Sequence, residues 1–183
     1  MQIIGLEKKQ CACCMEEHEV KTVLFTEHTT FKGKELEFEA EGCYCDSADS
    51  IFETEEQFNA NDRRLKEAYK KTCGLLSSGE IIEIRKKYGI SQTDFCILLG
   101  WGEKTIARYE SGYQVQDRAH DIILRKLSED PEWFIHLLTN AEQLISKKAF
   151  EKYLQQAKML YKNQLVYYEQ KVNQAKNISV ASA

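Results

Sequence analysis

Residues 90–110 read ISQTDFCILLGWGEKTIARYE, and this stretch predicts two short helices joined by a glycine turn. Ser91 can cap the first helix by accepting a backbone N–H, and Asp94, three residues later, completes a pattern that resembles a capping box. The apolar residues that follow have the i, i+3, i+4 spacing of a buried helix face: Phe95, Leu98 and Leu99. Gly100 and Gly102 then favour a tight turn, because glycine tolerates the backbone angles that such a turn needs.

The second helix is predicted over roughly residues 103–111, with Ile106 and Tyr109 facing inward. Lys104 and Arg108 are four residues apart and therefore share the outward face. Arginine can pair with guanine through two hydrogen bonds, and lysine can bind guanine or a phosphate. The pattern is typical of a helix-turn-helix that enters the major groove of DNA.

Six residues are the candidates for the DNA interface. Lys104 and Arg108 are expected to contact base edges, which specify the sequence. Phosphate contacts, which position the helix, are expected from Ser91, Gln92 and Thr105, and Trp101 in the turn completes the set. We expect Glu110 to make a buried pairing or cap instead. A dimer would place two such helices about 34 Å apart on a palindromic operator.

The composition indicates a soluble regulator. The chain has 183 residues, of which 43% are hydrophobic and 30% are charged, and no apolar run approaches the ~20 residues of a membrane span. No secretory signal is apparent, so a cytoplasmic location without membrane contact is expected. No serine–histidine pair, phosphate loop or paired-carboxylate site stands out, and an enzyme is therefore not expected.

The net charge of −4 is unevenly distributed. Residues 1–60 contain 14 acidic and 5 basic side chains, a local balance of −9. Because phosphates repel such a segment, the N-terminal part is predicted to bind a protein and not DNA.

The patterns predict an α+β protein with four parts. Residues 1–56 form a small β-rich, zinc-finger-like cysteine module, and residues 57–78 form a helical connector. Residues 79–140 form an all-α helix-turn-helix domain, and residues 141–183 form a C-terminal helical extension. The strands of the module are expected over residues 19–26 and around Leu36 and Phe38, with a turn between them at residues 32–34.

The extension contains a helix that begins near Ser146. Its apolar positions approximate a 4-3-4 repeat: Phe150, Leu154, Ala157, Tyr161, Tyr168 and Val172. Two interpretations follow, a helix packed on its own domain and a dimerisation helix.

Seven cysteines, an odd number, favour free thiols or metal ligands over a disulfide framework. Cys11-x-x-Cys14 has the spacing of a zinc knuckle, and Cys43-x-Cys45 is the candidate second pair, although one intervening residue is a less usual spacing. Cys13 and His18 are possible substitute ligands. The alternative is a set of reduced thiols, some of them buried as small apolar residues.

Over about residues 9–135 the chain resembles the MqsA-like (YgiT-type zinc finger) antitoxins of bacterial type II toxin–antitoxin systems. The resemblance is carried by the cysteine module and by an Xre-type helix-turn-helix, IRKKYGISQTDF followed by GWGEKTIARYE, from Ile84 to Glu110. It implies a structural zinc ion held by two CxxC pairs, and a dimer that represses its own operon. It also implies a toxin held by the N-terminal module.

The resemblance also implies that an Asn and an Arg of the recognition helix contact bases. These positions fall at Lys104 and Arg108, so the arginine matches and the asparagine is replaced. Two alternatives to an antitoxin remain from the sequence. One is a stand-alone repressor of a phage or mobile element, responsive to metal or thiol chemistry. The other is an adaptor whose helix-turn-helix serves protein contacts.

Overall fold

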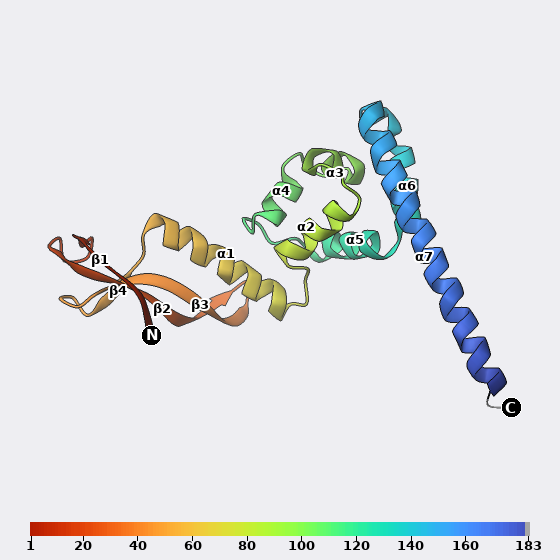
Figure 1. The fold of residues 1–183 in the computed structure, drawn as a ribbon. Helices are drawn as coiled ribbons and strands as arrows, with labels where there is room; N and C mark the ends of the chain where they lie inside the picture. Colours follow the sequence, from red (N-terminus) through yellow and green to blue (C-terminus); the bar gives the residue numbers. More distant parts are fainter. Residues whose placement is uncertain (182–183) are drawn as a thin grey trace. The chain divides into compact units, whose positions relative to one another are not determined.

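The computed structural model describes the backbone of residues 1–181 and the side chains of residues 1–171 (Figure 1). An antiparallel sheet precedes a series of helices, which confirms the predicted α+β class. The strands are β1 (Gln2–Gln10), β2 (Glu17–Phe31), β3 (Lys34–Cys45) and β4 (Ser50–Phe52). The helices are α1 (Glu55–Thr72), α2 (Ser78–Lys87), α3 (Gln92–Leu99), α4 (Thr105–Glu110), α5 (Arg118–Glu129), α6 (Pro131–Asn140), the short 3₁₀ helix η1 (Glu142–Leu144) and α7 (Lys147–Ala181).

The chain divides into two compact units. Met1–Ser77 and Ser111–Val115 form the first, called here the sheet unit. Ser78–Glu110 and Gln116–Ala183 form the second, called here the helical unit. None of the described helices combines the length and apolar composition that a membrane span requires.

The strands lie in the order β1-β2-β3-β4, and each pair is antiparallel. Lys32 and Gly33 join β2 to β3 with positive φ angles of 49° and 75°, as a tight hairpin turn with right-handed twist requires. The predicted strands and the turn between them are therefore confirmed. Strands β1 and β4 are not indicated by the sequence pattern.

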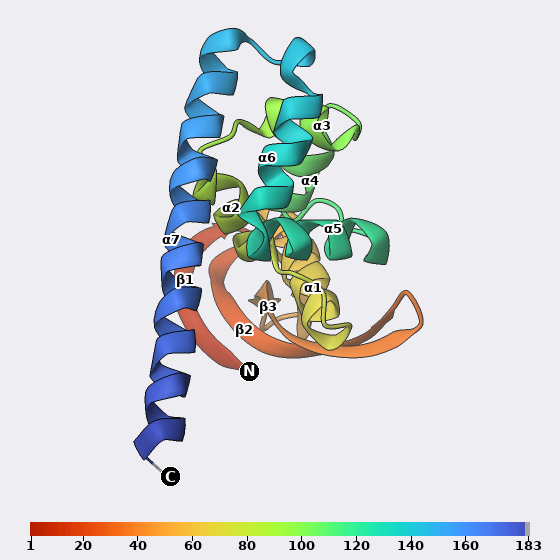
Figure 2. The same ribbon diagram turned by 90° about the vertical axis from the view of Figure 1, so that its right-hand side faces the viewer.

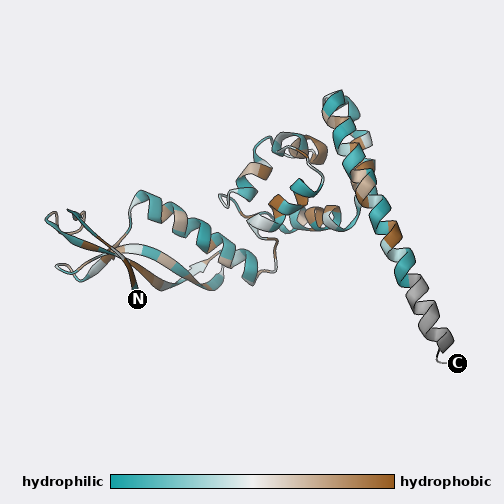
Figure 3. Ribbon diagram, in the orientation of Figure 1, coloured by the Kyte–Doolittle hydropathy of each residue, from teal (hydrophilic) through white to brown (hydrophobic). Residues whose placement is uncertain are grey.

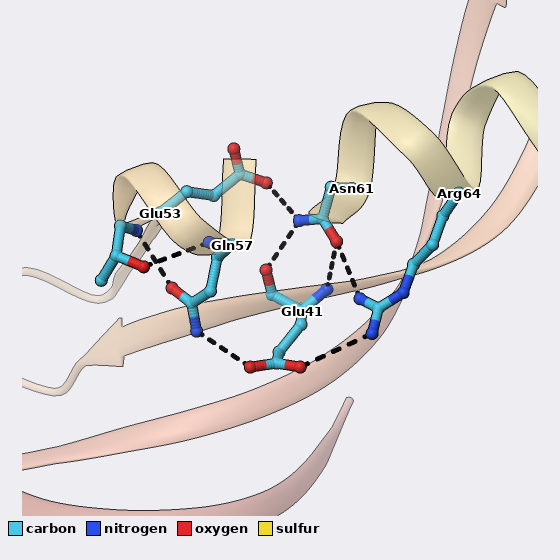
Figure 4. A network of polar contacts seen from close by, with 6 residues as sticks. Glu41, Glu53, Gln57, Asn61 and Arg64 are labelled. Atoms are coloured by element: carbon cyan, nitrogen blue, oxygen red, sulfur yellow. Dashed lines mark hydrogen bonds and ion pairs between the residues drawn. The ribbon is translucent and has the colours of Figure 1, made fainter. Parts of the chain in front are cut away.

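Helix α1 packs along β3 and covers part of its edge. Strand β4 pairs only with residues Cys43 to Cys45 of β3, so the backbone of Glu41 has no strand partner on that side. The side-chain amide of Asn61 in α1 takes this place, accepting from the N–H of Glu41 and donating to its C=O (Figure 4). Most of the segment predicted as a connector thus forms a helix that is part of the sheet unit.

The helical unit has an apolar core formed by α2 to α6, and Figure 3 shows that these helices contain both apolar and hydrophilic segments. Its buried residues include Ile81, Ile84, Tyr88, Ile90, Phe95, Leu98, Ile106, Tyr109, Leu124, Leu127, Phe134 and Leu138. Helix α7 lies alongside α6 and continues beyond it (Figure 2). Among its described side chains, Phe150, Tyr153 and Ala157 are buried, whereas Tyr168 is exposed. The side chain of Val172 lies outside the described residues.

Candidate functional site

Four potential metal ligands meet at one end of the sheet. The Sγ atoms of Cys11, Cys14 and Cys45 and a ring nitrogen of His18 all lie within 4.8 Å of one another. Cys11 directly follows β1 and Cys14 lies in the turn to β2, while His18 is in β2 and Cys45 ends β3. The group therefore joins three strands.

The turn between β1 and β2 wraps around the sulfur of Cys11. The N–H of Cys11 donates to Glu16 O at 2.8 Å, and the N–H of Met15 donates to Cys11 O at 2.9 Å. The N–H of Cys13 points at Cys11 Sγ, 3.4 Å away. Because such amide hydrogen bonds favour the thiolate over the thiol, the local backbone prepares Cys11 as an anionic ligand.

His18 has the orientation expected of a metal-ligating histidine. Its Nδ1 lies 2.8 Å from the backbone O of Glu19, which fixes the tautomer that leaves Nε2 as the ligand atom. Nε2 lies 3.6 Å from Cys45 Sγ. In a tetrahedral zinc site, with Zn–S near 2.3 Å and Zn–N near 2.0 Å, a sulfur and a nitrogen ligand are about 3.5 Å apart. The donor set and its spacing therefore fit a structural Cys₃His zinc site.

The pKa values of Cys11 and His18 are also shifted, and each shift favours the charged form of the side chain. Burial alone would raise the pKa of Cys11, but the backbone amides of Cys14 and Cys13, with His18 and Cys45, lower it to about 6. The Glu19 carbonyl, followed by Cys11, raises the pKa of His18 to about 9. At neutral pH the metal-free group therefore holds a thiolate beside an imidazolium, and a metal ion would replace the imidazolium proton.

Cys43, expected from the sequence to be a ligand, lies outside this group. Its buried thiol donates to Gln57 Oε1 at 3.4 Å. Cys45 Sγ, by contrast, lies 3.6 Å from His18 Nε2, so the fold brings Cys45 and not Cys43 into the group. His18 occupies the fourth place instead, one of the two substitutes considered from the sequence. The other substitute, Cys13, is exposed and its Sγ lies 3.1 Å from Ser50 Oγ.

A second candidate site is the pair of helices α3 and α4. Ser91 caps α3 by accepting from the N–H of Asp94 at 3.0 Å, and Gly100 ends the helix with a φ of 66°. Helix α4 begins at Thr105, two residues later than predicted, because residues 103 and 104 still belong to the turn. The two helices and the glycine turn are otherwise as the sequence predicts.

The two faces of α4 differ in burial. Ile106 and Tyr109 are buried, as predicted, whereas Lys104 and Arg108 are exposed. The N–H of Arg108 donates to Lys104 O at 3.0 Å, so these two residues are one helical turn apart. Thr105, between them, is half-buried.

Glu110 makes the buried pairing expected from the sequence. Its carboxylate accepts two hydrogen bonds from the guanidinium of Arg85 in α2, at 2.5 and 3.0 Å. The same carboxylate accepts from the side-chain amide of Gln92 at 2.6 Å. Glu110 therefore joins α2, α3 and α4, and it orients Gln92, one of the predicted phosphate contacts.

Trp101 is also held in place. Its ring stacks on His120 of α5 with centroids 3.8 Å apart and planes 13° apart. His120 Nδ1 in turn lies 2.8 Å from the hydroxyl of Tyr109. The sequence pattern does not indicate that Arg85 and His120 belong to this site, because their partners are distant in the sequence and no local spacing predicts the contacts.

Taken together, these features define an α+β protein in which a small Cys/His module precedes an all-helical unit. Residues 9–137 match the family model described as the antitoxin component of bacterial toxin–antitoxin systems, MqsA. The chain belongs to this family. The match includes the Cys/His group and the whole α3–α4 pair, and it ends before α7. A search of the curated proteins finds no match to the chain.

Proposed function

We propose that this antitoxin represses its own operon, using α3 and α4 as a helix-turn-helix that binds the operator. The observation that carries the proposal is the exposed position of Lys104 and Arg108, one turn apart, on a helix whose opposite face is buried. A basic helix face of this kind fits the major groove, where arginine can pair with guanine.

The supporting residues fit the same arrangement. Ser91 is exposed at the N-cap of α3, where a phosphate contact would position the motif, and Gln92 is oriented by Glu110. Helix α4 has six residues and is about 9 Å long, so one protomer contacts few base pairs. A homodimer on a palindromic operator in the cytoplasm supplies the remaining contacts.

The toxin would bind the sheet unit. Strand β1 is at the edge of the sheet and pairs only with β2, and its apolar side chains are exposed: Ile3 (52%), Ile4 (48%) and Leu6 (61%). An apolar, unprotected edge strand is a surface that a partner can cover by strand addition or by apolar contact. The acidic charge of residues 1–60 disfavours DNA as the partner of this unit.

A zinc ion would be held by Cys11, Cys14, His18 and Cys45. When bound, the metal supplies a cross-link between β1, the β1–β2 turn, β2 and β3. A sheet with few buried apolar residues gains folding free energy from such a link. The residues themselves supply charge balance, since thiolates offset the two positive charges of the ion.

Two experiments test the proposal. The gene adjacent to this one is induced with and without the antitoxin, and growth arrest relieved by co-expression is expected. The purified protein is also titrated with DNA from its own promoter and with a scrambled duplex. Preferential binding of the promoter is expected, and equal binding of both duplexes overturns the repressor function.

The toxin surface has its own variant. Leu6→Lys places a charge on the exposed edge strand, and we expect it to abolish co-purification of the toxin while DNA binding is unchanged. Thr26→Lys, at an exposed position of β2, is the matched control and should retain the toxin. Retention of the toxin by both variants would place the toxin surface elsewhere.

A further inference from the structure

The N-terminal turn of α3 is held by a side chain from outside the family match. Tyr153 belongs to α7 and lies 16 residues beyond residue 137, the last matched residue; only 4% of it is exposed. Its hydroxyl donates to Asp94 Oδ2 at 2.7 Å and accepts from the N–H of Ser91 at 3.3 Å. Ser91 Oγ also donates to the same carboxylate oxygen, at 2.9 Å. Tyr153 is thus the third member of the cap of α3.

Two further contacts join α7 to the connection between α2 and α3. Gln156 donates to the backbone O of Lys87, the last residue of α2, at 3.1 Å. Lys152 donates to Gly89 O at 3.4 Å. The contacts of α7 therefore extend along residues 87–94, from the end of α2 to the first turn of α3.

We propose that Tyr153 is a positioning residue for DNA binding, and that α7 is part of the DNA-binding head. This inference rests on the proposed helix-turn-helix function. In that motif the helix before the recognition helix crosses the DNA backbone. Tyr153 fixes the turn in which this helix begins, and Ser91, a predicted phosphate contact, is one of the residues that it holds.

The charge of Asp94 adds a second reason for this role. A carboxylate in the first turn of a helix is favourable for the helix itself, but it repels a DNA phosphate nearby. The hydroxyls of Tyr153 and Ser91 both donate to Asp94 Oδ2 and so keep the carboxylate in one position. Without the hydroxyl of Tyr153, the carboxylate has one donor fewer and the N-terminal turn loses its link to α7.

The test is Tyr153→Phe in the full-length protein, because phenylalanine keeps the ring and removes only the two hydrogen bonds. Affinity for promoter DNA and for a scrambled duplex is measured over a series of salt concentrations. We expect promoter affinity to fall roughly three- to tenfold, which corresponds to the loss of one hydrogen bond between the protein and a DNA phosphate. We also expect the scrambled duplex to lose a similar factor and the salt dependence to fall by about one phosphate contact.

The salt dependence separates positioning from a purely structural role. A variant that is merely less stable remains folded well below its melting temperature, so its number of phosphate contacts stays at the wild-type value. Tyr167→Phe is the matched control, because Tyr167 is an exposed tyrosine of the same helix. If Tyr153→Phe does not fold, Gln156→Ala tests the neighbouring contact and should show a smaller loss in the same direction.

The outcomes are distinguishable. Wild-type protein that shows no preference for its promoter overturns the proposed function and this inference with it. Promoter binding by the wild type, with unchanged affinity and salt dependence in Tyr153→Phe, overturns the role of Tyr153 alone. Loss of affinity in both Tyr153→Phe and Tyr167→Phe also overturns it, because the effect would then not be specific to the contact with α3.

Discussion

The side-chain amide of Asn61 pairs with both backbone groups of Glu41, accepting from the N–H at 3.0 Å and donating to the C=O at 2.7 Å. The second amide proton of Asn61 is donated to Glu53 at 2.6 Å (Figure 4). A helix residue thus replaces a neighbouring strand where β4 no longer pairs with β3. This contact protects one edge of the sheet, whereas β1 at the other edge has β2 as its one partner among the described strands.

Asn61→Ala should destabilise the sheet unit, because it leaves the N–H and C=O of Glu41 without their partner. Unsatisfied buried groups cost about 1–3 kcal/mol, and urea unfolding followed by circular dichroism measures the change. Asn59→Ala, at an exposed position of the same helix, should change the free energy of unfolding by less than about 0.5 kcal/mol. Equal effects of the two variants would show that the contact with Glu41 does not stabilise the unit.

The ion pair between Arg85 and Glu110 gives a second prediction. The side chain of Glu110 is 5% exposed and that of Arg85 is 17% exposed. Glu110→Ala should therefore cost about 3 kcal/mol, since it leaves a largely buried guanidinium and the amide of Gln92 without their acceptor. Thermal unfolding measures the loss.

The double variant Arg85→Met with Glu110→Leu distinguishes the loss of the whole ion pair from the cost of leaving one buried charge unpaired. Because no unpaired charge remains, we expect it to be more stable than Glu110→Ala alone. Glu103→Ala, at an exposed turn position, is the control for the loss of a negative charge. A double variant less stable than Glu110→Ala would contradict this account.

The proposed zinc site gives a third prediction. The wild type and Cys43→Ser should each retain about one zinc ion per chain, whereas Cys45→Ser should lose it. His18→Cys should also retain the metal, because it converts the set to Cys₄. Metal analysis gives the stoichiometry, and cobalt substitution should show a ligand-field spectrum that shifts between the wild type and His18→Cys.

Metal removal extends the same test. Chelation should lower the melting temperature of the sheet unit and reduce toxin binding, but DNA binding by the helical unit should persist. Loss of zinc from Cys43→Ser, with retention of zinc in His18→Ala, would contradict the Cys₃His set. It would instead support the four-cysteine set that the sequence alone indicates.

The parts of the structure that were predicted from the sequence are those with local signals. The cap at Ser91, the glycine turn and the hairpin at Gly33 each depend on residues within a few positions of one another. Strand β1 could not be predicted, because Ile3 and Ile4 are adjacent and its apolar and polar residues do not alternate. It is a strand because it pairs with β2. His18 joins the cysteine group and Cys43 does not, because the strands bring His18 to the group while the Cys43 thiol contacts Gln57 of α1. No local spacing in the sequence indicates either contact.

The final prediction concerns Arg108, the residue expected to specify sequence. Arg108→Ala should weaken promoter binding by about 1–3 kcal/mol and relax the preference at one base pair, while binding to a scrambled duplex changes less. Arg108→Lys should recover little of the specificity, because lysine lacks the planar fork that makes two hydrogen bonds with guanine. Competition titrations against single-base operator variants measure both effects. Arg63→Ala, an exposed arginine of α1, controls for the loss of one positive charge. Equal losses on promoter and scrambled DNA would reassign Arg108 from base recognition to a phosphate contact, because phosphate contacts weaken binding to all sequences alike.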